Sequence, residues 1–261
     1  MSTPNLQIEH DGAVATLWLD RPQVHNAFDE HLIAALTEAI GALDADDSVR
    51  VIVLAGRGKS FCAGGDLDWM RRMAGFSVEE NLRDAGALAT MLSTLARCAK
   101  PTIARVHGAA LAGGTGLVAA CDIVLATPNA TFGTTEVRLG LIPATISPYV
   151  IRAIGARAAQ RYFLTGERFD AAQALRLGLV HEICGAEALD TRLREIAGAL
   201  LAGAPLAQSA CKRLVQDVAA RPIDPALIHD TTARIADARG SDEAREGIAA
   251  FFAKRPPDWK T

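Results

Sequence analysis

The sequence lacks the patterns that mark several large classes of protein. Its five cysteines are spread over 261 residues, and no two of them have the spacing of a redox or metal-binding pair. The N-terminal stretch has no apolar run typical of a signal peptide, and nowhere does the chain reach the ~18 apolar residues of a membrane span. We therefore expect a soluble, cytoplasmic protein that binds no membrane and keeps its cysteines reduced.

Strong charge and the common catalytic motifs are also missing. The net charge is -3 and the lysines and arginines are scattered, which argues against a nucleic-acid partner. The chain has no P-loop, no G-x-S-x-G motif and no H-E-x-x-H zinc motif. Its six histidines form no cluster. Only His107 lies beside a Gly-rich loop, where a structural role is the simpler interpretation, and no metal site is expected.

What the chain does contain is an alternation of strand-like and helix-like segments. Short apolar runs at 13–20, 49–56 and 101–108 are typical of strands, and the second reads as a strand buried on both faces. Apolar residues recur at helical spacing after Asp29, a candidate helix cap, and again over 78–97. Strands that alternate with helices predict parallel pairing and an α/β fold. The C-terminal part of the chain is nearly all helical in pattern.

Two Gly-rich loops, "FCAGGDL" at 61–67 and "GAALAGGTGL" at 108–117, each follow a predicted strand. They can be simple turns, but the carboxyl ends of parallel strands are where α/β proteins bind ligands. Backbone N–H groups from both loops would then converge on one developing oxyanion. Glu136, in "TFGTTEVRLGLIP" at 131–143, would be a general acid–base candidate beside them.

These stretches, in this order, resemble the crotonase superfamily of enoyl-CoA hydratases and isomerases over essentially the whole chain. The resemblance rests on five segments: RPQVHNAF (21–28), GRGKSFCAGGDL (56–67), HGAALAGGTGLVAACDIVLAT (107–127), TFGTTEVRLGLIP (131–143) and FFAKRPPDW (251–259). It implies an α/β crotonase spiral of ββα units over 1–195 and a helical C-terminal trimerisation region over 196–261. The expected assembly is a homotrimer or a dimer of trimers.

The resemblance assigns the chemistry to specific residues. The N–H groups of Ala63 and Gly113 would form an oxyanion hole for the thioester carbonyl of an acyl-CoA, with Glu136 as the acid–base. The implied substrate and coenzyme A contacts are Val24, Ala27, Ala63, Gly65, Asp66, Leu67, Gly113, Gly114, Phe251 and Lys254. Coenzyme A enters as part of the substrate, so no separate cofactor is expected. Cys62 has no base at a recognisable spacing and is interpreted as a core residue.

One position departs from the best-known hydratases of the family. Those enzymes carry a second catalytic glutamate where this chain has Gly116. A single carboxylate is enough for an isomerase, which only moves one proton between two carbons. However, "TEVRLGLIPATISPYV" (135–150) and "DLDWM" (66–70) resemble a bacterial subgroup of methylglutaconyl-CoA and isohexenylglutaconyl-CoA hydratases, enzymes of leucine or isoprenoid catabolism.

The substrates of that subgroup carry a distal carboxylate. Arg71, Arg72 or Arg138 would pair with it, although each is more simply a surface arginine. The usual "PGAGGTQ" turn of the family is replaced by "PATISPY", which brings Thr145 and Tyr149 into the acyl-pocket region and leaves the length of the acyl chain open.

Three hypotheses of function follow. The leading one is a hydratase that adds water to a 2-enoyl-CoA, branched or carboxylated, with a single glutamate as acid and base. The alternative is a Δ3,Δ2-enoyl-CoA isomerase. The third, from another class, is a non-catalytic crotonase-fold protein that binds acyl-CoA or RNA. Glu136 beside two intact Gly-rich loops argues against the third.

Overall fold

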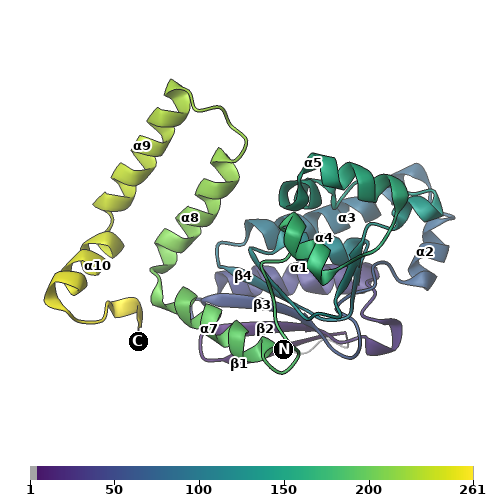
Figure 1. Ribbon diagram of the computed structural model, residues 1–261, viewed down its shortest axis with the longest axis horizontal. Coiled ribbons are helices and arrows are strands. Elements are labelled where there is room, and N and C mark those ends of the chain that lie inside the picture. Colours follow the sequence, from purple (N-terminus) through teal and green to yellow (C-terminus); the bar gives the residue numbers. More distant parts are fainter. Residues whose placement is uncertain (1–4, 261) are drawn as a thin grey trace.

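A six-stranded sheet forms the centre of the computed structural model, which describes residues 5–260 (Figure 1). In the order of the sheet, its strands are β1 (Leu6–Asp11), β2 (Val14–Leu19), β3 (Val51–Gly56), β4 (Thr102–Val106), β6 (Ile123–Ala126) and β9 (Glu182–Ile183). β1 and β2 pair antiparallel, and all the other neighbouring strands pair in parallel. All six residues of β3 are buried, as the apolar run at 49–56 predicted.

A smaller sheet lies beside the first and consists of β5 (Ala109–Leu111), β7 (Thr131–Gly133) and β8 (Phe169–Asp170). β5 and β7 pair in parallel, and β8 pairs antiparallel with β7. The chain that follows β3 joins β5 through a parallel bridge between Cys62 and Ala110. Three segments that are distant in sequence therefore run side by side in one direction.

Helices cover both faces of the larger sheet (Figure 1). The helices over the main apolar core are α1 (Glu30–Ala45), α3 (Val78–Arg97), α4 (Gly113–Ala120) and α5 (Ser147–Thr165). α1 begins at the predicted cap, since the Asp29 carboxylate accepts a hydrogen bond from the Leu32 N–H at 2.9 Å. On the other face, α7 (Leu189–Ala202) packs Leu189 against Val51 and Ile103. These layers confirm the predicted α/β fold, and the short helices α2 (Leu67–Met73) and α6 (Ala171–Leu177) complete it.

The C-terminal helices α8 (Pro205–Val218), α9 (Pro225–Gly240) and α10 (Asp242–Ala253) extend away from the layered core as an arm (Figure 1). The expected helical C-terminal extension is therefore present, and the division expected at 195/196 falls inside α7. Among residues 5–260, no helix is both long and apolar enough to cross a membrane.

Candidate active site

Both Gly-rich loops and Glu136 leave the smaller sheet at the same edge. The Cys62 N–H donates to the Ala109 carbonyl at 3.0 Å, and the Leu111 N–H donates back to the Cys62 carbonyl at 2.9 Å. β5 in turn pairs in parallel with β7, with Leu111 opposite Gly133. Because parallel strands end at the same edge of a sheet, the segments that follow Cys62, β5 and β7 emerge next to one another.

Beyond the bridge, Gly64 still lies beside Leu111 and Ala112, one residue before Gly65 and Gly113. The bridge itself pairs Cys62 with Ala110. The approach of Gly64 is close, because a Cβ atom on Gly64 would lie 3.0 Å from the Leu111 carbonyl oxygen. Gly64 also has a φ of +96°, which only glycine adopts readily. The first of the two adjacent glycines is thus required by backbone conformation and by space.

The structure contradicts the expected role of Ala63 and indicates Gly65 instead. The Ala63 N–H donates to the His25 carbonyl at 3.0 Å and is occupied. Phe28 bridges to Gly65 by donating to the Gly64 carbonyl and accepting from the Asp66 N–H. In such a parallel bridge, the N–H of the central residue points away from its partner strand. None of the hydrogen bonds found among residues 5–260 uses the Gly65 N–H.

Gly113 supplies a second open N–H as the first residue of α4. The preceding Ala112 has an unusual left-handed φ of +49° and donates its own N–H to the Gly133 carbonyl at 2.7 Å. The first N–H groups of a helix have no partner within the helix, and that of Gly113 has no acceptor within the described chain. A Cβ on Gly113 would lie 2.1 Å from Cζ of the Phe28 ring, so only glycine fits there.

Glu136 opens the 3₁₀ turn η2 (Glu136–Leu139), three residues after the end of β7. Its Oε2 atom is buried and has no hydrogen-bond partner in the described chain. Burial disfavours the charged form and raises the pKa of this carboxyl above its usual range. A carboxyl with a raised pKa and an unused buried oxygen is suited to take up a proton and return it.

A buried ionic network holds the Gly65 loop in place, and sequence reasoning missed its centre, Arg21. The guanidinium of Arg21 donates to the Ala27 carbonyl at 2.6 Å and to the Asp66 carboxylate at 3.0 Å, and it lies 3.2 Å from Asp29. The other oxygen of Asp66 accepts the Asp68 N–H and so caps α2. Asp66, an expected coenzyme A contact, therefore has both carboxylate oxygens occupied by protein donors.

Asn26 is a second residue that sequence reasoning missed. It is fully buried, and its side-chain oxygen accepts the Arg21 N–H at 2.8 Å. Its amide donates to the carbonyls of Arg57 and Ser60 at 2.8 and 2.7 Å. The only signal in the sequence was a polar residue directly before the apolar Ala27 and Phe28. Asn26 fastens the 21–28 loop to the strand end from which the Gly65 loop departs.

Of the remaining expected contact residues, four lie near the Gly-rich loops and two lie on the C-terminal arm. Val24 and Ala27 lie in the 21–28 loop, and Leu67 is an exposed residue at the start of α2. Gly114 follows Gly113 in α4, where a Cβ would lie 2.2 Å from the Cys62 carbonyl oxygen. Phe251 and Lys254 are exposed residues at the end of α10, and the single chain does not bring the arm to α2 or α4 (Figure 1).

The position of the absent second glutamate is filled. Gly116 is buried in α4, and a Cβ there would lie 2.2 Å from Cγ2 and 2.8 Å from Cβ of Ile146. Ile146 is itself 1% exposed and belongs to the main core. A carboxylate at 116 therefore has no room unless Ile146 moves.

Several other candidates take structural roles. Burial raises the pKa of the Cys62 thiol to about 12, which fits a core residue rather than a nucleophile. His107 shares a hydrogen bond of 2.9 Å between its Nε2 and the Gly58 carbonyl. Tyr149 is half-buried against the main core, and Thr145 is half-buried beside Ile146 in sequence. Within residues 5–260, no group of three or more His, Cys, Asp or Glu side chains is placed to hold a metal ion.

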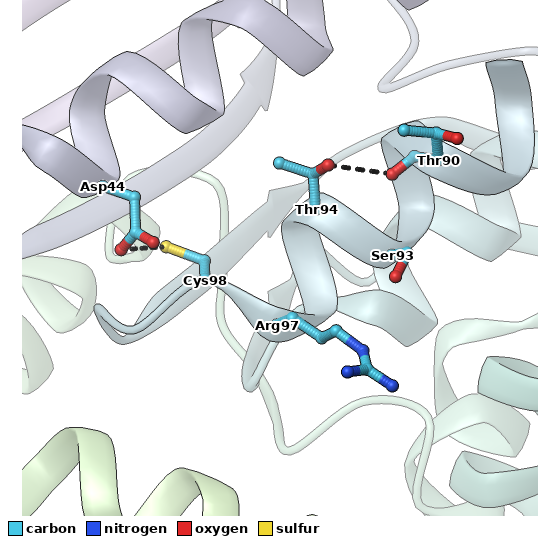
Figure 2. A pocket seen from close by; sticks show the side chains of 6 residues that line it. All are labelled: Asp44, Thr90, Ser93, Thr94, Arg97 and Cys98. Atoms are coloured by element: carbon cyan, nitrogen blue, oxygen red, sulfur yellow. Dashed lines mark hydrogen bonds between the residues drawn. The ribbon is translucent and has the colours of Figure 1, made fainter.

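A surface pocket between α1 and α3 is separate from these loops (Figure 2). Its lining residues are Asp44, Thr90, Ser93, Thr94, Arg97 and Cys98. The Asp44 carboxylate accepts from the Cys98 thiol at 3.1 Å and from the Ala99 N–H at 2.9 Å, so it joins the end of α1 to the turn after α3. The Thr94 hydroxyl donates to the Thr90 carbonyl within the helix. These bonds describe a helix end rather than a reactive site.

Comparisons with known proteins agree with this arrangement. The sequence profile of the family described as enoyl-CoA hydratase/isomerase matches residues 9–261. A crotonyl-CoA hydratase of Syntrophomonas wolfei is 31% identical over 98% of this chain and 97% of its own. A 4-chlorobenzoyl coenzyme A dehalogenase of Arthrobacter is 32% identical over 97% of this chain and 92% of its own. The crystal structure of an enoyl-CoA hydratase from Shewanella pealeana has a TM-score of 0.95, with 43% identity over 98% of this chain and 96% of that one.

Proposed function

This chain belongs to the enoyl-CoA hydratase/isomerase family, and on that premise we propose that it adds water across the C2=C3 bond of a 2-enoyl-CoA thioester. The observation that carries the proposal is the arrangement of Gly65, Gly113 and Glu136 at one edge of the smaller sheet. The segments that leave this edge carry two backbone N–H groups without acceptors among residues 5–260 and one desolvated carboxyl. Relatives that carry the hydratase name support the same assignment.

The oxyanion hole of this proposal consists of the N–H groups of Gly65 and Gly113. They would hold the thioester oxygen, which gains negative charge as an enolate forms. Fixed backbone donors lower the barrier because they need no reorganisation when that charge develops. The positive end of α4 adds to the same stabilisation, since Gly113 is its first residue.

Glu136 acts in the proposal as both base and acid. It takes a proton from the attacking water and later delivers a proton to C2. Burial raises the pKa of this carboxyl, and the higher proton affinity favours its use in both transfers. No second carboxylate is needed at Gly116, where Ile146 occupies the space.

We propose further that the acyl group is branched or carboxylated, as in the methylglutaconyl- and isohexenylglutaconyl-type substrates of the resembling subgroup. Arg71 is paired with Asp68 and Arg72 with Glu30, at 2.5 and 2.6 Å. Arg138 has no ion-pair partner among residues 5–260 and follows Glu136 by two positions. Arg138→Gln is therefore expected to raise KM for a glutaconyl-type CoA relative to a neutral branched enoyl-CoA, whereas Arg71→Gln leaves the ratio unchanged.

A homotrimer or a dimer of trimers completes the proposal. The arm carries an apolar groove of about 760 Å³ lined in part by Leu206, Leu214, Ile235 and Ile248. Ile235 and Ile248 remain 50% and 56% exposed in the single chain, and a contiguous apolar surface of this kind is typical of an interface. A neighbouring subunit would cover this groove. Light scattering on the purified protein measures the assembly, and a monomer would contradict it.

A panel of acyl-CoA thioesters tests the function directly. Loss of the enoyl-thioester absorbance with a 2-enoyl-CoA indicates hydration, whereas conversion of a 3-enoyl-CoA to its 2-enoyl isomer indicates the alternative activity. The isomerase remains the second candidate because one carboxylate, Glu136, suffices for it. Binding without turnover of any thioester would favour a non-catalytic role.

A further inference from the structure

Two unpaired buried atoms lie within three residues of each other after β7. Among residues 5–260, the buried side-chain polar atoms without a hydrogen-bond partner are His107 Nδ1, Thr134 Oγ1 and Glu136 Oε2. Buried polar groups in folded proteins nearly always have a partner, so each exception needs a physical reason. For Glu136 the reason is its proposed proton transfer. The proton transfer proposed for Glu136 does not explain the unpaired hydroxyl of Thr134.

Thr134 is held firmly at the edge of the site. It is 1% exposed, so its hydroxyl cannot turn to bulk solvent without a change in the backbone. The preceding residue, Gly133, is fixed on both sides, because its N–H donates to the Thr115 hydroxyl at 3.2 Å and its carbonyl accepts the Ala112 N–H at 2.7 Å. Thr134 therefore follows directly on the backbone contact that positions the start of α4.

Two unpaired oxygens this close in the chain are candidates to share one small polar molecule. The Cα atoms of Thr134 and Glu136 are at most about 7 Å apart, because two residues of chain span no more than that. Each hydrogen bond to a bridging water adds about 2.8 Å of reach. A water bound in this position needs two or more polar partners, which a hydroxyl and a carboxylate provide.

We propose that Thr134 and Glu136 together hold the water molecule that is added to the substrate. The Thr134 hydroxyl orients this water in place of a second carboxylate. This inference rests on the proposed hydratase function. Gly116 cannot contribute, because Ile146 occupies the space beside its Cα. Thr134 only orients the water and transfers no proton.

The atoms and electrons of the step balance with these groups alone. The water oxygen forms a bond to C3 while one of its protons passes to Glu136. The C2=C3 electron pair moves toward the thioester, whose oxygen becomes an enolate held by the N–H groups of Gly65 and Gly113. The proton on Glu136 then bonds to C2, the thioester carbonyl is restored, and the carboxylate is regenerated.

Thr134→Val tests the proposal, with Thr134→Ser and Thr135→Val as comparisons. Valine keeps the shape of threonine without the hydroxyl, serine keeps the hydroxyl, and Thr135 is the adjacent threonine, whose side chain caps nothing. We expect Thr134→Val to lower kcat for hydration at least tenfold with KM nearly unchanged, which corresponds to about 1.4 kcal/mol. Thr134→Ser should retain most of the rate, and Thr135→Val should match the wild type.

A second measurement separates water positioning from general damage to the site. Exchange of the C2 protons of a saturated acyl-CoA with D₂O, followed by NMR, needs the oxyanion hole and Glu136 but no added water. Thr134→Val should leave this exchange within about twofold of the wild type. If the hydroxyl had only a packing role, valine would be neutral or stabilising for the fold and would not change the ratio of hydration to exchange.

The outcomes are distinct. A folded Thr134→Val enzyme that hydrates at the wild-type rate overturns this inference and leaves the proposed function intact. Equal losses of hydration and exchange also overturn it, because they indicate a disturbed site. A wild-type enzyme that exchanges C2 protons but hydrates no 2-enoyl-CoA overturns the proposed function, and the inference with it.

Discussion

Removal of the Gly65 N–H is the sharpest test of the proposed oxyanion hole. Gly65→Pro deletes a donor that has no acceptor among residues 5–260, whereas Ala63→Pro deletes one already bonded to the His25 carbonyl at 3.0 Å. Loss of one fixed oxyanion donor costs about 2.7–4 kcal/mol in the transition state, or 10²–10³-fold in kcat. Gly65→Ala keeps the N–H, and its Cβ would lie 3.3 Å from the edge of the Trp69 ring, so it controls for added bulk.

The assay compares kcat for hydration, acyl-CoA binding by calorimetry and thermal unfolding for these three variants. We expect Gly65→Pro to lose at least 10²-fold in kcat while binding changes much less, and Gly65→Ala to stay within about tenfold of the wild type. Ala63→Pro should mainly lower the unfolding temperature, since it breaks a structural bond. A folded Gly65→Pro enzyme with the same kcat as Gly65→Ala would refute the assignment of Gly65 to the hole.

Three further predictions follow from the same residues. Glu136→Gln should lower kcat at least ~10²-fold with little change in KM. In the wild type, the raised pKa of Glu136 means that the hydration rate falls as pH decreases through a value above 4.5. A pH–rate profile measures this, and an acid limb at or below 4.5 would contradict it. Asp66→Asn should lower the free energy of unfolding by about 1–3 kcal/mol, measured by denaturant unfolding. Although burial opposes ionisation, the N–H donors of α2 and Arg21 lower the Asp66 pKa, so the stabilisation is present above the unfolded-state pKa and is lost as pH falls through the folded-state pKa. Unchanged stability of Asp66→Asn would show that this ionic network does not stabilise the fold. Gly116→Glu should destabilise the protein, because its Cβ would meet Ile146. It should not increase the hydration of crotonyl-type substrates unless Ile146→Ala is added. A stable Gly116→Glu variant with faster hydration would show that the space beside Gly116 is not filled.

Much of the fold and the general place of the site were predictable, because they depend on local patterns. Apolar runs predicted β3 and β4, Asp29 predicted the start of α1, and the two Gly-rich loops predicted the edge at which the candidate site lies. Glu136 was selected as the acid–base candidate from the segment 131–143. These features are encoded in a few consecutive residues each, so they can be read without knowledge of the tertiary contacts.

The direction of individual N–H groups was not predictable. Ala63 and Gly65 differ by two positions, and only the pairing with His25 and Phe28, nearly 40 residues earlier, decides which of them is occupied. The partner of Asp66 was not predictable either, because Arg21 lies 45 positions earlier and no local pattern links the two residues. Ile146, which lies 30 positions after Gly116, became visible as its neighbour only in the folded chain.

Water addition itself is the central claim, and isotope incorporation tests it most directly. The wild-type enzyme is incubated in H₂¹⁸O with a branched glutaconyl-type CoA and, separately, with a crotonyl-type CoA, and the products are analysed by mass spectrometry. We predict one ¹⁸O atom on C3 of the product from at least one of these 2-enoyl-CoA thioesters. If no label enters any product while a 3-enoyl-CoA is converted to its 2-enoyl isomer, the enzyme is an isomerase and the hydratase account is wrong.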